Sequence, residues 1–160
     1  MNFVKAVQAL TDAQAEFVII GGWSAILNGS SHVTNDLDIC FARTRENCKR
    51  IAAALTTFHP RLRDFPKDLP FVWDETTLQN GTIFTLSTDL GALDLLAEVS
   101  GLGGFDDVKR HSVRVDAFDR QVWTLDLPSL IKAKRAAGRE KDLRALPELE
   151  SLLESSEPDK

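Results

Sequence analysis

A buried strand, a glycine pair and a second strand with two aspartates follow one another near the start of this chain. The segment reads VIIGGWSAILNGSSHVTNDLDICFA from Val18 to Ala42. Aspartate is disfavoured in strands, yet Asp36 and Asp38 lie in the apolar run that ends this segment. Because strand side chains alternate between faces, both carboxylates lie on one face, with Cβ atoms about 7 Å apart. The fold must therefore leave that face to water or to a ligand.

Two carboxylates this close repel each other, so the pKa of one rises unless a cation lies between them. A hard divalent cation that prefers oxygen ligands, such as Mg²⁺, removes this cost. The plainer interpretation is a solvated edge strand, because an Asp-x-Asp pair alone is a weak signal. Asp94 favours the metal, since it lies inside a later apolar run, GALDLLA, where an unpaired buried carboxylate is costly. Sharing a cation with Asp36 and Asp38 would stabilise it.

Residues that suit phosphate binding lie between the two strands. Gly21 and Gly22 end the first strand and open a helix, where glycines let a phosphate approach backbone N–H groups. An ordinary tight turn is the alternative. Ser24 and Thr34 offer hydroxyls on either side of the intervening loop. Among the tryptophans, Trp23 is the best candidate to stack on a base, although a core position is the commoner role.

The pattern along the chain predicts an α+β domain built on a mixed sheet of about five strands, with flanking helices and a short C-terminal helical end. Spacing and caps indicate helices at about 2–11, 23–27, 44–58, 105–110, 127–137 and from 140 into the 150s. Strand patterns occupy about 16–20, 36–42, 82–87, 91–97, 113–117 and 121–124. Residues 59–77 indicate a long loop with a short strand near 71–73. We expect one domain over 1–154 and a flexible tail over 155–160.

Composition and charge exclude several classes of protein. The length of 160 residues suits one domain with a core. The net charge of −5 argues against a general nucleic-acid coat, which needs a basic face, but a local cationic pocket or a metal can still hold a small nucleotide. No apolar run is long enough to span a membrane, and the N-terminus lacks a signal-peptide pattern. We therefore expect a cytoplasmic protein with Cys40 and Cys48 as free thiols.

The spacing of the glycines and aspartates resembles the signature of the nucleotidyltransferase superfamily of DNA polymerase β. That signature is an apolar residue, Gly-Gly or Gly-Ser, a spacer, and Asp-x-Asp or Asp-x-Glu. Here the glycine pair after Ile20 is separated by thirteen residues from the DLD motif that begins at Asp36. GGWSAILNGSSHVTNDLDI looks like the small bacterial members related to the AbiEii toxin and the minimal nucleotidyltransferases. Those commonly carry Gly-Gly-x-Ala, a short helix ending in Gly, and then Arg-x-Thr-x-Asp-Leu-Asp.

The resemblance extends downstream and has one departure. Asp94 matches the third carboxylate of the family. The segment LPSLIKAKRAAGREKDLRALPELE is similar to the family's closing helices, in which four charged positions recur: Lys134, Arg139, Lys141 and Asp142. His32 stands where relatives usually carry an arginine. Because histidine is mostly neutral near pH 7, a fixed phosphate-binding charge is missing there unless Lys134 or Arg139 compensates.

The resemblance implies a nucleotidyltransferase-like fold and Mg²⁺-dependent transfer of a nucleoside monophosphate from a nucleoside triphosphate to an acceptor hydroxyl. Asp36 and Asp38 would hold one Mg²⁺ at the triphosphate. Asp94 would complete a second metal site beside the acceptor and take its proton. Lys134 would neutralise the charge that develops on the leaving pyrophosphate. The phosphates would be cradled by residues of the first loop: Gly21, Gly22, Ser24 and Thr34.

The acceptor and the partners stay open at this stage. The acceptor hydroxyl would belong to a partner protein, a tRNA end or a small molecule such as an aminoglycoside or lincosamide. The alternative is a catalytically weak toxin–antitoxin component that acts as a partner-binding module, and His32 keeps this alternative open. A third interpretation is an α+β domain with a coincidental acidic strand. Titration with Mg²⁺ and each nucleoside triphosphate would separate the three.

Overall fold

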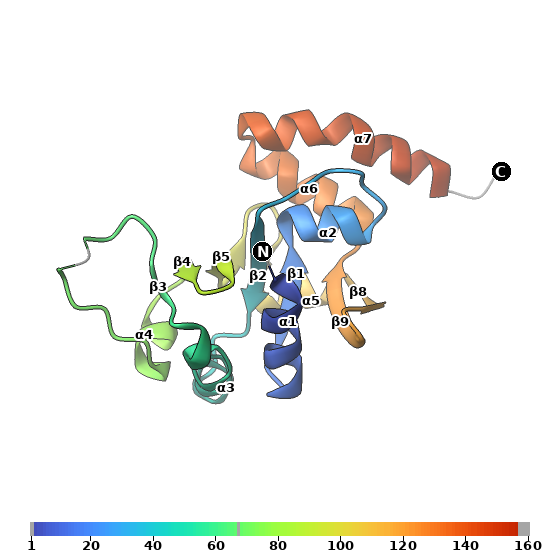
Figure 1. Ribbon diagram of the computed structural model, residues 1–160. Coiled ribbons are helices and arrows are strands. Elements are labelled where there is room, and N and C mark those ends of the chain that lie inside the picture. The colour runs from blue at the N-terminus through green and yellow to red at the C-terminus, as the bar shows by residue number, and fades with distance from the viewer. Residues whose placement is uncertain (1, 67, 157–160) are drawn as a thin grey trace.

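A mixed β-sheet organises the residues that the computed structural model describes, which are 2–66 and 68–156. Its strands are β1 (Phe17–Ile20), β2 (Asp36–Phe41), β3 (Arg61–Leu62), β4 (Ile83–Thr88), β5 (Gly91–Leu96), β8 (Ser112–Ala117) and β9 (Arg120–Leu125). Over the described residues these seven strands lie in the order β3-β4-β5-β2-β1-β9-β8 (Figure 1). A separate two-stranded pair consists of β6 (Glu98–Val99) and β7 (Gly103–Gly104).

The sheet is larger than the predicted five strands for two reasons. β3 is only two residues long and lies in the segment with three prolines, so it shows no alternation of apolar and polar residues. The β8–β9 hairpin joins the same sheet because β9 pairs in parallel with β1, with Thr124 opposite Ile19. Such a pairing between distant parts of the chain leaves no local sequence pattern.

Parallel pairing of β2 with β5 brings the aspartates of two distant segments together. Asp38 lies opposite Asp94, and Asp36 lies opposite Ala92. On its other side β2 runs antiparallel to β1, with Asp38 opposite Ile20. β2 is therefore an interior strand, and the interpretation of its aspartates as a solvated edge strand is wrong.

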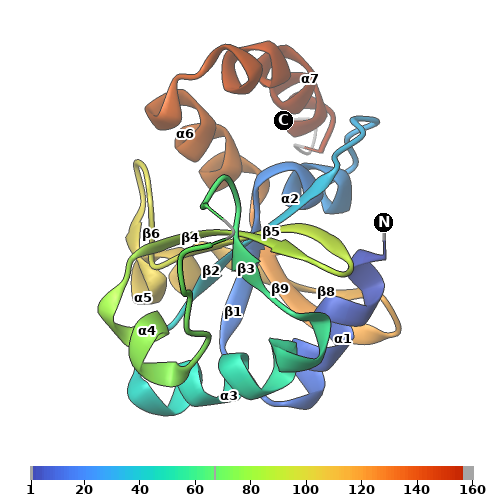
Figure 2. The same cartoon turned by 60° about the vertical axis from the view of Figure 1, so that its left-hand side comes forward.

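Helices cover both faces of the sheet. They are α1 (Phe3–Asp12), α2 (Gly21–Leu27), α3 (Arg45–Leu55, followed by the 3₁₀ turn Thr56–Phe58), α4 (Glu75–Asn80), α5 (Phe105–Arg110), α6 (Leu127–Ala137) and α7 (Glu140–Ser156). Leu37, Ile39 and Phe41 of β2 pack in one core with α1 and α3. Cys40, on the opposite face of β2, belongs to a second core with α5, α6 and α7. Figure 2 shows α1 and α3 on one side of the sheet and α6 and α7 on the other.

Capping residues fix the ends of α6, which carries part of the site. Asp126 is its N-cap and accepts a hydrogen bond from the backbone N of Ser129, while Pro128 occupies the first turn. Gly138 adopts a left-handed conformation with φ 65°, which ends the helix. The chain then turns back, so that α7 packs on α6 through the core that contains Leu130 and Leu149.

The segment 59–77 differs from the expectation of a loop with a strand near 71–73. Residues 71–73 are not in a strand, and the strand of this segment is β3, which pairs with β4. α4 begins within the expected loop because Asp74 caps it, accepting a hydrogen bond from the backbone N of Thr77. A six-residue helix of Glu, Thr, Gln and Asn with one buried leucine, Leu78, has no apolar stripe that would predict it.

The structure also bears on the expectations for the C-terminal tail, for membrane spans and for the two cysteines. α7 continues through Ser156, so residues 155 and 156 are helical; the rest of the predicted tail, 157–160, lies outside the described residues. In the part of the chain that the structure describes, no helix has both the length and the apolar character needed to cross a bilayer. Cys40 and Cys48 are confirmed as free thiols, and both are buried.

Candidate active site

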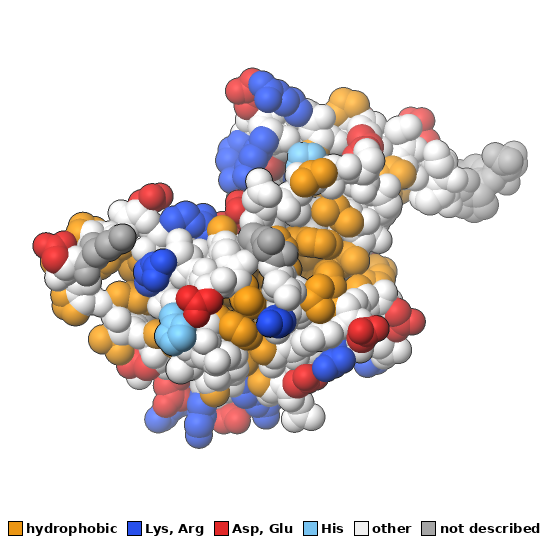
Figure 3. Space-filling model, viewed as in Figure 1, with side chains coloured by type: hydrophobic (Ala, Val, Ile, Leu, Met, Phe, Trp, Pro, Cys, Tyr) orange, Lys and Arg blue, Asp and Glu red, His pale blue; other side chains and the backbone are white. Residues whose placement is uncertain are grey.

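A cleft of about 450 Å³ separates α6 and α7 from the face of β2 and β5 that carries Asp36, Asp38 and Asp94, here called the acidic face. Figure 3 shows the molecule hollowed at this level, with Lys and Arg side chains gathered at the α6–α7 end. Seven of the eight predicted site residues line the cleft: Gly21, Gly22, Thr34, Asp36, Asp38, Asp94 and Lys134. The fold thus brings residues from three distant segments to one cavity, while the role of each residue stays a prediction.

The acidic face holds its three carboxylates close together. Asp38 and Asp94 are direct neighbours across the parallel strands, and Asp36 lies two residues before Asp38 on the same face. Burial, together with the negative charges of Asp94 and Asp36, raises the pKa of Asp38 to about 6. Lys141 and Arg139 act in the opposite direction but do not offset these effects. Ionisation of Asp38 therefore lowers the stability of the folded protein.

Asp38 has the properties of a carboxylate that lacks a counter-ion. Its Oδ1 atom is buried and has no hydrogen-bond partner among the described residues. Carboxylate oxygens are the ligands that Mg²⁺ prefers, and a cation here would relieve both the burial cost and the repulsion from Asp94 and Asp36. The donor set therefore fits Mg²⁺. As the side chains stand, the described residues contain no group of three or more His, Cys, Asp or Glu side chains already spaced as a metal site.

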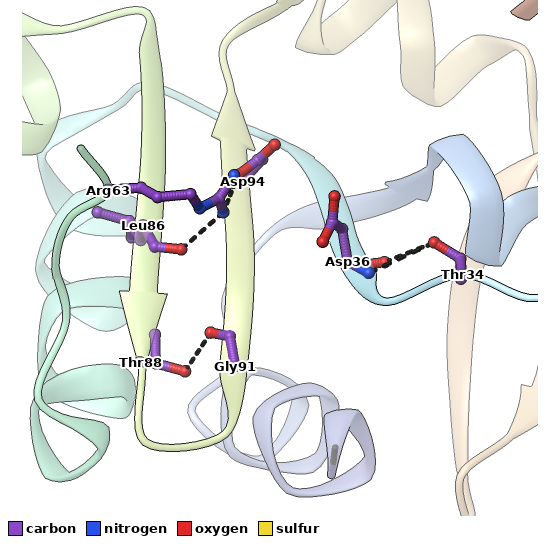
Figure 4. Close-up of polar contacts among 7 residues, drawn as sticks. All are labelled: Thr34, Asp36, Arg63, Leu86, Thr88, Gly91 and Asp94. Atoms are coloured by element: carbon purple, nitrogen blue, oxygen red, sulfur yellow. Dashed lines mark hydrogen bonds and ion pairs between the residues drawn. The ribbon is translucent and has the colours of Figure 1, made fainter. Parts of the chain in front are cut away.

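The glycine pair makes room for two side chains of the same cleft. Gly21 has φ 64°, in the left-handed region, and a Cβ there would overlap the carboxylate of Asp38. A Cβ on Gly22 would lie only 2.8 Å from the Oγ1 of Thr34. The Oγ1 of Thr34 in turn accepts a hydrogen bond from the backbone N of Asp36, at 3.4 Å (Figure 4). Both glycines therefore allow the start of α2 to pack against β2 and the residues that precede it.

Ser24 does not line the cleft, which argues against the prediction that its hydroxyl cradles a phosphate. Its side chain is fully buried, and its Oγ forms a hydrogen bond of 2.7 Å with the Oγ1 of Thr124, which ties α2 to β9. Trp23 packs edge-on against Phe3 and Phe118, which places it in the core rather than at a nucleobase. On a helix of only seven residues, the sequence does not show which side chains face the cleft.

The opposite wall of the cleft carries a partly buried cluster of charges. Asp142 is only 3% exposed and pairs with Lys134 (Nζ to Oδ1, 3.7 Å) and with Arg139 (Nε to Oδ2, 2.7 Å). Burial lowers the pKa of Lys134, although Asp142 opposes this. The pKa of Asp142 lies below its usual range. Burial acts to raise it, but the hydrogen bond and charge of Arg139 and the charge of Lys134 outweigh burial. Asp142 thus holds two cations in place at the cleft, beside Lys141.

Arg63 contacts the acidic face through Asp94, and no pattern in the sequence marks it. Its Nη2 donates to Asp94 Oδ1 and to the backbone O of Leu86, both at 2.8 Å (Figure 4). Its backbone N donates to the O of Thr85 at 2.8 Å, which continues the pairing of β3 with β4. Arg63 lies in the irregular segment after β3, where no periodicity marks it. Only the course of this segment along β4 brings the guanidinium to Asp94.

The loop between α2 and β2 is attached to α7 through Glu148. Ser30 Oγ and Ser31 Oγ donate to separate carboxylate oxygens of Glu148, and the backbone N of Ser31 donates at 3.3 Å. The hydrogen bonds from Ser30 and Ser31 lower the pKa of Glu148. His32 comes next in this loop, is exposed and lines the cleft. The position at which the sequence resemblance leads one to expect an arginine therefore borders the cavity, and it holds an imidazole.

Comparison with solved structures identifies the fold. A structure from Thermotoga maritima, described as a "putative nucleotidyltransferase", matches 94% of this chain and 93% of that chain, with a TM-score of 0.58 and 14% sequence identity. This chain has a nucleotidyltransferase-like fold. No protein-family model and no curated protein matches it. At 14% identity the likeness shows the fold alone, so the nucleotidyltransferase-like fold places the cleft in a known architecture without naming its substrate.

Proposed function

We propose that this protein is a nucleotidyltransferase that uses Mg²⁺ to move a nucleoside monophosphate from a nucleoside triphosphate to an acceptor hydroxyl. The observation that carries the proposal is the pairing of Asp38 with Asp94 on interior strands, across a cleft from Lys134 and Arg139. A triphosphate needs cationic side chains along its length and carboxylates for the metal ions that accompany it. The nucleotidyltransferase-like fold supports the same class.

The α6–α7 wall binds the triphosphate in this proposal. Lys134 and Arg139, held by Asp142, offset the charge that accumulates on the pyrophosphate as it leaves. Gly21 and Gly22 carry no side chains, so the backbone beside the acidic face stays uncovered for the phosphates. The bond between the α-phosphorus and the bridging oxygen of pyrophosphate breaks as the acceptor oxygen bonds to the α-phosphorus.

In this proposal the acidic face binds the metal and activates the acceptor hydroxyl. Asp36 and Asp38 would hold Mg²⁺, with Asp94 beside them, and the metal would neutralise phosphate charge and acidify the acceptor hydroxyl. Asp94 would accept the proton of the acceptor hydroxyl. Asp38 is ionised above its pKa of about 6, so this arrangement is complete near neutral pH.

The acceptor class follows from the resemblance to the small bacterial AbiEii-related and minimal nucleotidyltransferases. It would be a partner protein, a tRNA end or a small molecule such as an aminoglycoside or lincosamide. The second candidate is a catalytically weak toxin–antitoxin component that binds a partner protein. His32 favours it, because this exposed residue lines the cleft where relatives carry a permanent charge.

Nucleotide binding and nucleotide transfer test the proposal separately. Calorimetry with each of the four nucleoside triphosphates should show binding that requires Mg²⁺ and is abolished by EDTA. Transfer is then measured as pyrophosphate release with a tRNA pool, the product of the neighbouring gene, or an aminoglycoside as acceptor. Asp38→Asn should abolish transfer. The matched control is Asp116→Asn, the same change at an exposed aspartate of the edge strand β8, and it should change neither measurement.

The outcomes distinguish the two candidates. Binding of a nucleoside triphosphate with transfer to none of these acceptors would favour the partner-binding module. Transfer that survives Asp38→Asn would overturn the roles given to the acidic face. If millimolar Mg²⁺ promotes no binding of any nucleoside triphosphate, the proposal of a nucleotidyltransferase is wrong.

A further inference from the structure

Arg63 is anchored at three points around Asp94. Its Nη2 is shared between Asp94 Oδ1 and the O of Leu86, and its backbone N donates to the O of Thr85. Thr85 is itself the residue of β4 that lies opposite Asp94 in the sheet. The guanidinium is thus fixed by the same strands that carry its partner, which suits a support rather than a mobile gate.

The bond between Arg63 and Asp94 forms in surroundings that strengthen it. The side chains are 29% and 21% exposed, so solvent only partly screens the pair. Charge-assisted hydrogen bonds to carboxylates are among the stronger ones in proteins. Figure 4 shows Arg63 reaching Asp94 from the β4 side, while Asp36 lies on the β2 side. Asp94 is therefore held from one side and borders the cleft on the other.

We propose that Arg63 is a positioning residue that orients the carboxylate of Asp94 for binding a divalent cation, an inference that rests on the proposed function. By holding Oδ1, it leaves the second oxygen of Asp94 for a cation shared with Asp38. Without this anchor the Asp94 carboxylate turns about its side-chain torsions, and repulsion from Asp38 drives it away from β2. Asp94 is the carboxylate that touches the reactants, and Arg63 acts through it.

Two effects of Arg63 on cation binding have opposite signs. As a positive charge, it repels a divalent cation and weakens binding. As an anchor, it fixes a ligand in place and strengthens binding, and loss of such outer partners typically weakens metal binding by roughly 10–100-fold. Direct contact with Asp94 makes the anchoring effect the larger one. Removing Arg63 therefore weakens cation binding, whereas a purely electrostatic role would strengthen it.

Titration of the nucleotide-free protein with Mn²⁺, followed by the electron paramagnetic resonance signal of the free ion, tests this sign. Arg63→Met keeps the length of the stem but removes the bonds, and it should weaken Mn²⁺ binding roughly tenfold or more. Arg63→Lys restores one donor to Asp94 and should bind Mn²⁺ within roughly threefold of wild type. The matched control is Arg61→Ala, which removes an exposed charge two residues away and should change nothing.

The results separate a failure of the role of Arg63 from a failure of the proposed function. If Arg63→Met binds Mn²⁺ as tightly as wild type or more tightly, the positioning role is overturned while the proposed function stands. Melting temperatures check each fold, and if Arg63→Met does not fold, a tenfold loss or gain in Arg63→Lys overturns the role instead. If wild type and Asp38→Asn bind Mn²⁺ equally, the proposed function and the role of Arg63 both fall.

Discussion

The carboxylate of Asp38 occupies the space that a side chain at position 21 would need. Gly21 opens α2 with φ 64°, and a Cβ built on it would overlap the Asp38 carboxylate. The glycine pair and the aspartates are therefore one packing unit, although thirteen residues separate Gly22 from Asp36. In this chain the glycine that precedes the aspartates thus has a structural cause that is independent of any ligand: the carboxylate of Asp38 leaves no room for a side chain at position 21.

Gly21→Ala should destabilise the protein by about 2–3 kcal/mol, because it adds backbone strain and displaces the Asp38 carboxylate. Gly138→Ala is the matched control, since Gly138 has φ 65° and a Cβ there would lie no closer than 3.6 Å to its neighbours. It should cost about 1 kcal/mol. Urea unfolding measures both. Equal losses in the two variants would show that Asp38 moves aside without cost.

Asp38→Asn should stabilise the metal-free protein at pH 7.5 by about 2–3 kcal/mol but not at pH 4. The pKa of Asp38 is about 6 in the fold, above the ordinary 3.8. The folded state therefore holds the proton more tightly, and wild type loses stability as the pH rises from 3.8 to 6. The amide carries no such cost. Urea unfolding in EDTA at both pH values measures the gap, and a gap that is the same at both would contradict the prediction.

Asp142→Asn should destabilise the protein by about 3 kcal/mol, because it leaves Lys134, whose side chain is only 14% exposed, without its counter-ion. Glu150→Gln is the control: it breaks the ion pair with Arg135, whose partners are both well exposed, and should cost less than about 1 kcal/mol. Chemical unfolding compares the two. A similar small effect from both variants would mean that solvent already screens Lys134.

Ser24→Ala should lower stability by about 1 kcal/mol through loss of the bond with Thr124, while leaving the affinity for nucleoside triphosphates unchanged. Thr34→Val, at a residue that lines the cleft, should weaken nucleotide binding instead. Calorimetry and thermal unfolding of both variants separate packing from binding. Weaker nucleotide binding by Ser24→Ala would restore the phosphate role that its buried position argues against.

The positions of the three carboxylates follow from the sequence, because strand alternation gives the shared face of Asp36 and Asp38, and the apolar surroundings of Asp94 indicate a partner. Family resemblance also led to Lys134. The location of Arg63 does not follow, since it depends on an irregular segment crossing β4, and the environment of Asp94 therefore depends on a contact that no local pattern encodes. Likewise, the size of the sheet depends on the parallel pairing of β9 with β1, which is a property of the whole chain.

The cleft is assembled from opposite ends of the polypeptide, and this sets an order during synthesis. Asp36, Asp38 and Asp94 are added to the chain before β9 is synthesised, and Lys134 and Asp142 are added later still. The carboxylates of the acidic face are therefore synthesised before the cations of the opposite wall. The cleft is complete only once α6 and α7 have been synthesised, so the growing chain passes through most of translation without its second wall.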